Sequence, residues 1–256
     1  MAKETRLDKL LCDNGFGTRS QIKQQLKQGI VLVNGEVEKN PARKIGEDDH
    51  VMYGQKLLAR RGLEYYMLHK PAGCVSATKD QLSDTVMKFL ENENVRDLFP
   101  VGRLDKDTEG LLLITNDGEL SHKLLSPKKH VEKTYVVILN KTISEEDRIR
   151  LEQGIDIGDE KPTKEAIVSR YKEAGENAYK ITITEGRFHQ VKRMFEAVGS
   201  KVIYLKRISF GGLMLDAGLK KGEYRKLKKE EIEQLKANSK DKETNSDVTK
   251  HESSDF

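Results

Sequence analysis

The sequence of 256 residues is poor in the residues that mark secreted, membrane-spanning or metal-binding proteins. It has no tryptophan, and its two cysteines, Cys12 and Cys74, stand apart with no C-x-x-C or Cys/His spacing. Regularly spaced cysteines are typical of disulfide frameworks and zinc sites, so neither is expected here. Its apolar runs are only a few residues long, whereas a transmembrane helix needs about 20. We expect a cytoplasmic protein with free thiols, no metal site and no membrane segment.

The charge is weakly positive overall but unevenly distributed. The net charge is +4 at pH 7, which by itself does not establish a nucleic-acid partner. Between Lys180 and Arg207, seven bases face two acids, so the positive charge is concentrated within the part expected to fold. The last stretch, residues 236–256, is polar, charged and nearly devoid of apolar residues. We expect it to be a disordered tail.

The first 58 residues have the pattern of a small separate module. Two short helices are predicted, the second between an N-cap at Thr18 and a stop at Gly29, and Asn34-Gly35 predicts a hairpin turn. On the second helix three bases recur at every fourth position, so they share one face: Arg19, Lys23 and Lys27. Their spacing is compatible with a solvated face or with a row of phosphate contacts, and it does not decide between them.

The stretch "RLDKLL…GFGTRSQIKQQLKQGIVLVNGEVEKNPARKIGEDDHV" resembles an S4 domain, a small RNA-binding module with an α-L fold. The similarity covers nearly all of residues 1–58, and residues 59–62 are expected to form a hinge. The resemblance implies that the basic face of the second helix contacts structured RNA. Because S4 modules occur in many kinds of protein, it implies RNA binding without implying an enzyme.

Residues 63–235 alternate between strand and helix patterns, which indicates an α/β or α+β domain around one mixed sheet. No glycine-rich phosphate loop and no internal repeat is present. Strands are predicted in "EYYMLHK", "GLLLIT", "EKTYVVILN", "AYKITITEG" and "KVIYLKRISFGGL", and helices in "SDTVMKFLENEN", "ELSHKLLSP", "SEEDRIRLEQG", "RFHQVKRMFEAVG" and "KKEEIEQLK".

Five carboxylates crowd into "VGRLDKDTEGLLLITNDGEL": Asp105, Asp107, Glu109, Asp117 and Glu119. The first three match the start of a calcium loop, but Asn116 stands where such a loop needs a bidentate glutamate. A solvated turn accounts for the last two acids, since "NDGE" is turn chemistry. Asp105 lies between Leu104 and a buried strand, so it should be partly desolvated and need a cationic or hydrogen-bonding partner.

The same stretch resembles the catalytic signature G-R-L-D…T-x-G-L-L-L of the RsuA/RluA group of pseudouridine synthases. The segments "YYMLHKPAG", "SPKKHVEKTYVV", "EGRFHQVKRMFEAVG", "VIYLKRISFGG" and "GEYRKL" agree as well, and "EKTY" points to the RsuA type. The resemblance implies an α+β catalytic domain with a mixed, mostly antiparallel sheet flanked by helices. It implies that Asp105 is the catalytic carboxylate, with neither cofactor nor metal. It also implies that Lys192 is its cationic partner and that Tyr135 and Leu205 sandwich the flipped base.

The remaining implications of the resemblance concern RNA. Arg103 matches an arginine that in some relatives takes the place of the flipped base, and Arg187 and Arg193 are expected to contact phosphates. The scattered histidines, His189 among them, are given no catalytic role. The expected partner is 16S rRNA or an assembling small subunit, bound by a monomer. Two alternatives remain open, namely the same reaction on 23S rRNA and an inactive ribosome-assembly factor that binds RNA.

Overall fold

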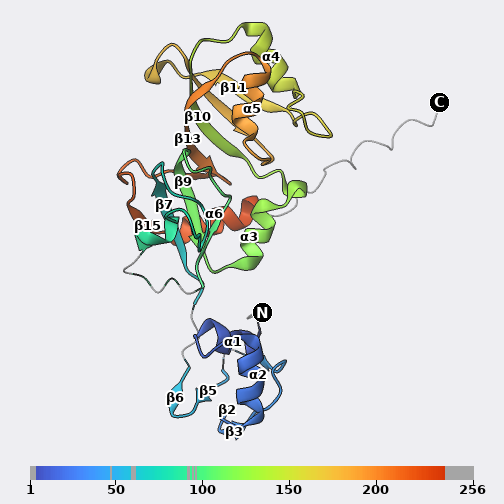
Figure 1. Cartoon of the computed structure of the whole chain (residues 1–256), viewed down its shortest axis with the longest axis vertical. Helices are drawn as coiled ribbons and strands as arrows, with labels where there is room; N and C mark the ends of the chain where they lie inside the picture. Colours follow the sequence, from blue (N-terminus) through green and yellow to red (C-terminus); the bar gives the residue numbers. More distant parts are fainter. Residues whose placement is uncertain are drawn as a thin grey trace, which may run out of the picture. The chain divides into compact units, whose positions relative to one another are not determined.

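The computed structural model describes residues 4–46, 48–58, 62–90, 93, 95 and 97–239. The chain divides into two compact units, one of Met1–Leu63 with Asn94–Asp97 and one of Glu64–Glu93 with Leu98–Phe256 (Figure 1). Most of the expected hinge and residues 240–256 lie outside the described residues. The last helix, α6 (Lys229–Asn238), runs two residues past Lys236, where the tail was expected to begin, and the tail itself stays a prediction. Within the described residues no helix is long and apolar enough to cross a membrane.

The smaller unit packs two helices against short strands. Helix α2 begins at a capping box in which Gln21 and Thr18 satisfy each other's backbone N–H groups. Its buried side chains, Ile22 and Leu26, join a core with Leu7 and Leu11 of α1. The elements of this unit are β1 (Thr5–Arg6), α1 (Leu7–Asp13), α2 (Arg19–Lys27), β2 (Val31–Val33), β3 (Glu36–Val37), β4 (Lys44–Ile45), β5 (Val51–Tyr53) and β6 (Lys56–Leu57).

The larger unit is built on one mixed sheet, as expected for an α+β domain. Its strand order is β11-β12-β10-β13-β9-β7-β15, with β14 on β13 and β8 on β9. The pairing of β13 with β9 is parallel, and the other described strand pairs of this sheet are antiparallel. The strands are β7 (Tyr65–Lys70), β8 (Phe99–Val101), β9 (Glu109–Thr115), β10 (Lys133–Leu139), β11 (Ala166–Arg170), β12 (Ala178–Ile183), β13 (Val202–Phe210), β14 (Leu213–Met214) and β15 (Tyr224–Lys226).

The helices lie at the two ends of this sheet. Figure 1 shows α4 and α5 beside the β10–β11 end and α3 and α6 beside the β9–β7–β15 end. The segment expected to be a helix from Ser83 forms only a short 3₁₀ helix, η1 (Val86–Leu90). The other helical elements are α3 (Gly118–Leu125), η2 (Pro127–Lys129), α4 (Glu145–Gln153), η3 (Lys172–Ala174) and α5 (Gln190–Ala197).

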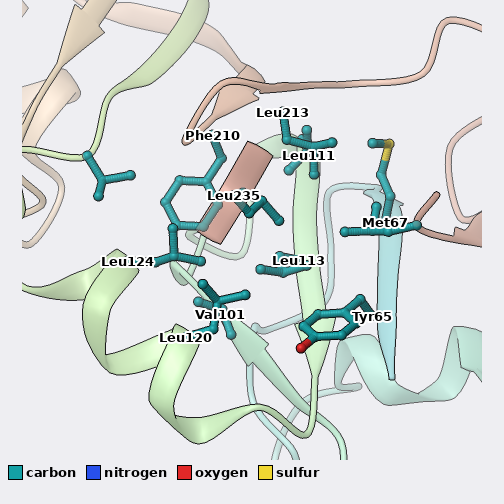
Figure 2. Packing of buried hydrophobic residues seen from close by; sticks show 12 residues of the cluster. Tyr65, Met67, Val101, Leu111, Leu113, Leu120, Leu124, Phe210, Leu213 and Leu235 are labelled. Carbon is teal, nitrogen blue, oxygen red and sulfur yellow. The ribbon is translucent and has the colours of Figure 1, made fainter. Parts of the chain in front are cut away.

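One face of β7 and β9 forms a hydrophobic core with α3 and α6. Tyr65 and Met67 of β7 form one cluster with Leu111 and Leu113 of β9, and Leu120 and Leu124 of α3 belong to the same cluster (Figure 2). The Tyr65 hydroxyl is not left unsatisfied, because it donates a hydrogen bond of 2.7 Å to Asp117. This core anchors β9, whose first residue follows the loop that carries Asp105.

Candidate active site

The loop between β8 and β9 carries Asp105, and a buried lysine of β7 hydrogen-bonds the backbone of this loop. Lys70 of β7 is fully buried, and its ammonium donates to the carbonyl oxygens of Asp105 (3.0 Å), Lys106 (3.3 Å) and Thr108 (2.8 Å). The Ser76 hydroxyl donates to the Leu104 carbonyl at 2.9 Å. Burial lowers the pKa of Lys70, and its carbonyl partners compensate for its lost hydration. The backbone around the carboxylate is therefore fixed by the sheet.

Helix α5 places a cation beside this loop. The Lys192 ammonium lies 3.2 Å from Asp105 Oδ2 and 2.6 and 2.9 Å from the two oxygens of Asp107. Although partial burial opposes the shift, the hydrogen bond to Asp107 and the charge of Asp105 raise the pKa of Lys192. The predicted Asp105–Lys192 pair is present in the structure. Asp107, which sequence analysis left without a role, shares the same lysine.

The five acids of the signature separate into different tasks. Glu109 accepts hydrogen bonds from Tyr204 (2.8 Å) and Lys221 (2.9 Å), away from Asp105. Asp117 is buried and caps α3 by accepting from the backbone N–H groups of Glu119 and Leu120, so the expectation that it is a solvated turn residue was wrong. No group of three metal-ligating side chains occurs among the residues with described positions.

A cavity of about 650 Å³ opens beside Asp105. Tyr135 of β10 and Leu205 of β13 line it, and both are buried. These strands are antiparallel neighbours, and Tyr135 stands opposite Arg207, two residues after Leu205. Because residues two apart on a strand share a face, the sheet register brings the tyrosine and the leucine to the same wall. Asp105 is 29% exposed at this cavity, with His189 Nε2 at 3.8 Å from its other oxygen.

Two further cations, which sequence analysis did not single out, line the cavity from the sheet. Lys133 precedes Tyr135 by two residues on β10, and Arg207 follows Leu205 by two on β13, so both face the same side. A register shift between Thr134 and Tyr135 also brings Phe210 to this side, with its ring 4.9 Å from the Arg207 guanidinium and 5.8 Å from the Lys133 ammonium. The only sequence signal for Arg207 is a charged residue inside an apolar strand pattern.

The glycines of the signature make room for Arg207. Gly102 has φ +69°, and a Cβ there would meet the Arg207 guanidinium and the Phe210 ring at 3.2 Å. Gly110 has φ +106°, and a Cβ there would meet the backbone oxygen of Arg207 at 2.1 Å. Only glycine tolerates both the dihedral angle and the close approach of β13 to β9. The G-R-L-D…T-x-G pattern thus reflects the shape of the site as well as its chemistry.

The three arginines that were predicted to contact RNA differ in how many hydrogen bonds their side chains already make within the protein. Arg103 is exposed and lines the cavity. Arg187 donates to Glu185, to Asp159 and to the backbone carbonyls of residues 161 and 162. Arg193 donates to Asp159 and to the backbone carbonyl of residue 157. Both arginines therefore fasten the segment between α4 and β11 to α5. Their expected phosphate contacts stay a prediction.

His189 is the N-cap of α5 and has a left-handed backbone conformation, and Phe188 before it lies at the rim of the cavity. Phe188 is 75% exposed and stacks on the His189 ring, with centroids 3.8 Å apart. Sequence analysis gave this histidine no catalytic role, and it named neither this aromatic pair nor the buried Lys70. Their positions depend on the turn before α5 and on the strand register, which spacing in the sequence does not reveal.

Comparison with known proteins agrees with this architecture. Residues 64–197 match the RNA pseudouridylate synthase family, and residues 5–51 match the S4 domain. The chain is 46% identical over 234 residues to the uncharacterized RNA pseudouridine synthase YtzG of Bacillus subtilis, covering 90% of this chain and 98% of that one. It is 41% identical over 233 residues to the ribosomal small subunit pseudouridine synthase A of Haemophilus influenzae, covering 90% and 99%.

A solved structure supports the same assignment. The crystal structure of a pseudouridylate synthase matches with a TM-score of 0.65 and 40% identity, over 90% of this chain and 99% of the other. The similarity therefore extends over both units and includes Asp105, Tyr135, Lys192 and Leu205 within the matched span. The chain belongs to the RNA pseudouridine synthase family, among relatives that include the ribosomal small subunit pseudouridine synthases A.

Proposed function

We propose that this protein converts one uridine of small-subunit (16S) ribosomal RNA to pseudouridine. The reaction breaks the bond between ribose C1′ and uracil N1, turns the base and rejoins it through C5. It is an isomerisation, so it needs no net oxidant, reductant or water. The observation that supports it best is Asp105 at the edge of the cavity, with the Lys192 ammonium at 3.2 Å. The names of the relatives point to the small-subunit substrate.

The proposed roles follow from the geometry. Asp105 acts on the sugar as a nucleophile or as a base, and the Lys192 ammonium at 3.2 Å places a positive charge beside its carboxylate. The uridine must leave its stack to reach the cavity, which costs a few kcal/mol. Tyr135 and Leu205 recover part of this by packing on the two faces of the base. Arg103, exposed on the loop, would fill the space that the base vacates.

The S4 unit would hold the RNA while the larger unit performs the reaction. Arg19, Lys23 and Lys27 are all exposed along α2, whereas Ile22 and Leu26 of the same helix are buried. Such a row of cations suits a phosphate backbone. We propose that the protein acts as a monomer in the cytoplasm, on naked rRNA or on an assembling small subunit.

The proposal is tested by mapping pseudouridines in 16S and 23S rRNA from cells that carry Asp105→Asn as the sole copy. One 16S pseudouridine should disappear, because the neutral amide can neither attack nor deprotonate the sugar. Glu146→Gln, on the exposed face of α4, is the matched control and should leave the 16S pattern intact.

Three outcomes would contradict the assignment in different ways. An unchanged pattern with Asp105→Asn would refute the catalytic role of Asp105. Loss of a 23S pseudouridine would move the same reaction to the large subunit. Absence of any turnover by the purified wild-type protein on either rRNA would favour an inactive assembly factor, which the intact Asp105–Lys192 pair argues against.

A further inference from the structure

The sheet wall of the cavity contains two buried cations that have no anionic partner. Arg207 is 1% exposed and Lys133 is 8% exposed. Arg207 Nε donates to the Leu111 carbonyl at 2.8 Å, the guanidinium has the neutral Tyr135 hydroxyl as a polar partner, and Nη2 has no partner. Lys133 donates to the Val131 carbonyl at 2.6 Å. Within the described part of the chain neither forms an ion pair. Burying a charge without a counter-charge is strongly unfavourable, so the arrangement calls for an explanation.

The acids closest to these cations are already engaged. Glu185, whose charge acts on Lys133, accepts hydrogen bonds from Arg187, from Gln190 and from the backbone N–H of Lys164. Asp105 is paired with Lys192 at 3.2 Å. Of the charged residues that line the cavity, five are basic and two are acidic. The cavity is therefore electropositive, and most strongly at the sheet wall.

The two cations lie next to the residues that are proposed to bind the base. They alternate with Tyr135 and Leu205 on neighbouring strands, so they lie beside the residues proposed to sandwich the uracil ring. A phosphate group, which stays on the RNA backbone, would be expected nearer the exposed rim, where Arg103 and Phe188 lie. The wall that contacts the base therefore carries the unpaired positive charge.

We propose that Lys133 and Arg207 are catalytic residues that stabilise the negative charge on uracil after its bond to the ribose breaks. This inference rests on the function proposed above. When C1′–N1 breaks, its electron pair goes to the base and spreads over N1, O2 and O4. Asp105 meanwhile takes up C1′ or removes the proton from C2′. After the base turns, C5 bonds to C1′, the sugar regains any proton it lost, and the C5 proton is replaced by one on N1. No atom is gained or lost.

Such a wall favours the transition state over the bound substrate. Uridine is neutral before its bond breaks, so the fixed cations gain most of their interaction energy as the base becomes anionic. The cations need no reorganisation at that moment, because the strands and the Phe210 ring already hold them in place. This also explains why the fold retains an unfavourable pair of buried charges.

The test uses Lys133→Met, which keeps most of the length of the side chain and removes its charge. The substrates are 16S rRNA transcripts made with uridine or with 5-fluorouridine, whose fluorine stabilises the base anion. Single-turnover rates of loss of the target nucleoside are measured with saturating enzyme. We expect a fall of about 10²-fold on uridine, a fall at least about 5-fold smaller on 5-fluorouridine, and unchanged RNA affinity. Lys133→Arg should retain the rate within about 10-fold.

Controls separate chemistry from folding. Lys141→Met, on the exposed residue two positions after β10, should match the wild type. Lys133→Met should melt no lower than the wild type, because it removes an unpaired buried charge. Should Lys133→Met melt too low to assay, Arg207→Met, which removes the charge of the other cation, provides the same comparison of the two substrates.

Several results would overturn the inference. Equal rate losses on the two substrates would exclude stabilisation of the leaving base. Weaker RNA binding with an unchanged rate would assign the cations to a phosphate instead. An unchanged rate on uridine would leave them no role in the reaction. If the wild-type protein converted no target in either transcript, the failure would lie with the proposed function.

Discussion

At the scale of single residues, the site is defined by which charges are paired. Lys192 is shared by two carboxylates, and their attraction raises its pKa despite partial burial. Lys133 has no such partner, and burial followed by the charge of Arg207 lowers its pKa to about 8. Two lysines of the same active site are thus shifted in opposite directions. The first is paired with carboxylates that are already present, and the second is suited to meet an anion that forms transiently.

The shift of Lys133 predicts a dependence of stability on pH. The pKa is about 8 in the folded protein and 10.5 in the unfolded chain, so between these values the unfolded chain binds more protons and the free energy of unfolding rises with pH. Lys133→Met lacks this rise. The free energy of unfolding of Lys133→Met minus that of the wild type should therefore be about 3 kcal/mol larger at pH 7 than at pH 10.5. Urea denaturation of both proteins at the two pH values measures this difference.

The other charged groups around Lys133 are Arg207 on β13 and Glu185, and both are present in the two proteins. Their titration therefore cancels when the variants are compared. A stability difference that stayed constant from pH 7 to pH 10.5 would show that Lys133 has an ordinary pKa and is not desolvated.

At the scale of elements, the site depends on how closely β13 approaches β9. These strands pair in parallel with Gly110 opposite Arg207. Gly110→Ala would drive its Cβ to 2.1 Å from a backbone oxygen at a dihedral angle that alanine rarely adopts. We expect a loss of roughly 3–5 kcal/mol in the free energy of unfolding, from overpacking and backbone strain together. Chemical denaturation measures it, and activity should fall with it.

The matched control is Gly118→Ala, at the start of α3. A Cβ there meets no atom within 4 Å, and its φ is not positive, so stability should change by less than about 1 kcal/mol. A Gly110→Ala protein as stable as the Gly118→Ala protein would mean that the two strands can separate without loss.

Most elements were predictable from local pattern. The strands β9, β10, β12 and β13 and the helices α3, α4 and α5 lie within the segments where periodicity and capping residues placed them. The segment after Ser83 instead forms the 3₁₀ helix η1, and β11 was not predicted. Local propensity predicted both segments incorrectly. For β11 the reason is that its pairing with β12 forms only in the folded sheet.

At the scale of the whole molecule, each unit has its own hydrophobic core. The smaller unit exposes three cations along α2, and none of the three forms an ion pair within the described residues. Replacing Arg19, Lys23 and Lys27 together by alanine should weaken binding to 16S rRNA. The slope of log K against log salt should become shallower by about 2–3, since each phosphate contact contributes about 0.7–0.9. Filter binding from 50 to 300 mM KCl, on the order of the physiological range, measures it.

Lys172→Ala, on an exposed turn of the larger unit, removes one charge as a control and should leave the slope nearly unchanged. A triple variant with the wild-type slope would mean that the basic face of α2 is solvated in the complex. The spacing in the sequence left these two possibilities open, and the exposure of the three side chains is compatible with both.

The sequence by itself determined the two-part organisation, the strand and helix patterns and the candidate residues Asp105, Tyr135, Lys192 and Leu205, because these depend on local periodicity and on motif resemblance. Only the tertiary structure decided which charges meet. It paired Asp107 with the lysine of Asp105, joined the buried Asp117 to the Tyr65 hydroxyl and left Lys133 and Arg207 without a carboxylate partner in the wall that Tyr135 and Leu205 line. Such contacts join residues tens of positions apart, and their energies depend on burial and strand register, which no short stretch of sequence contains.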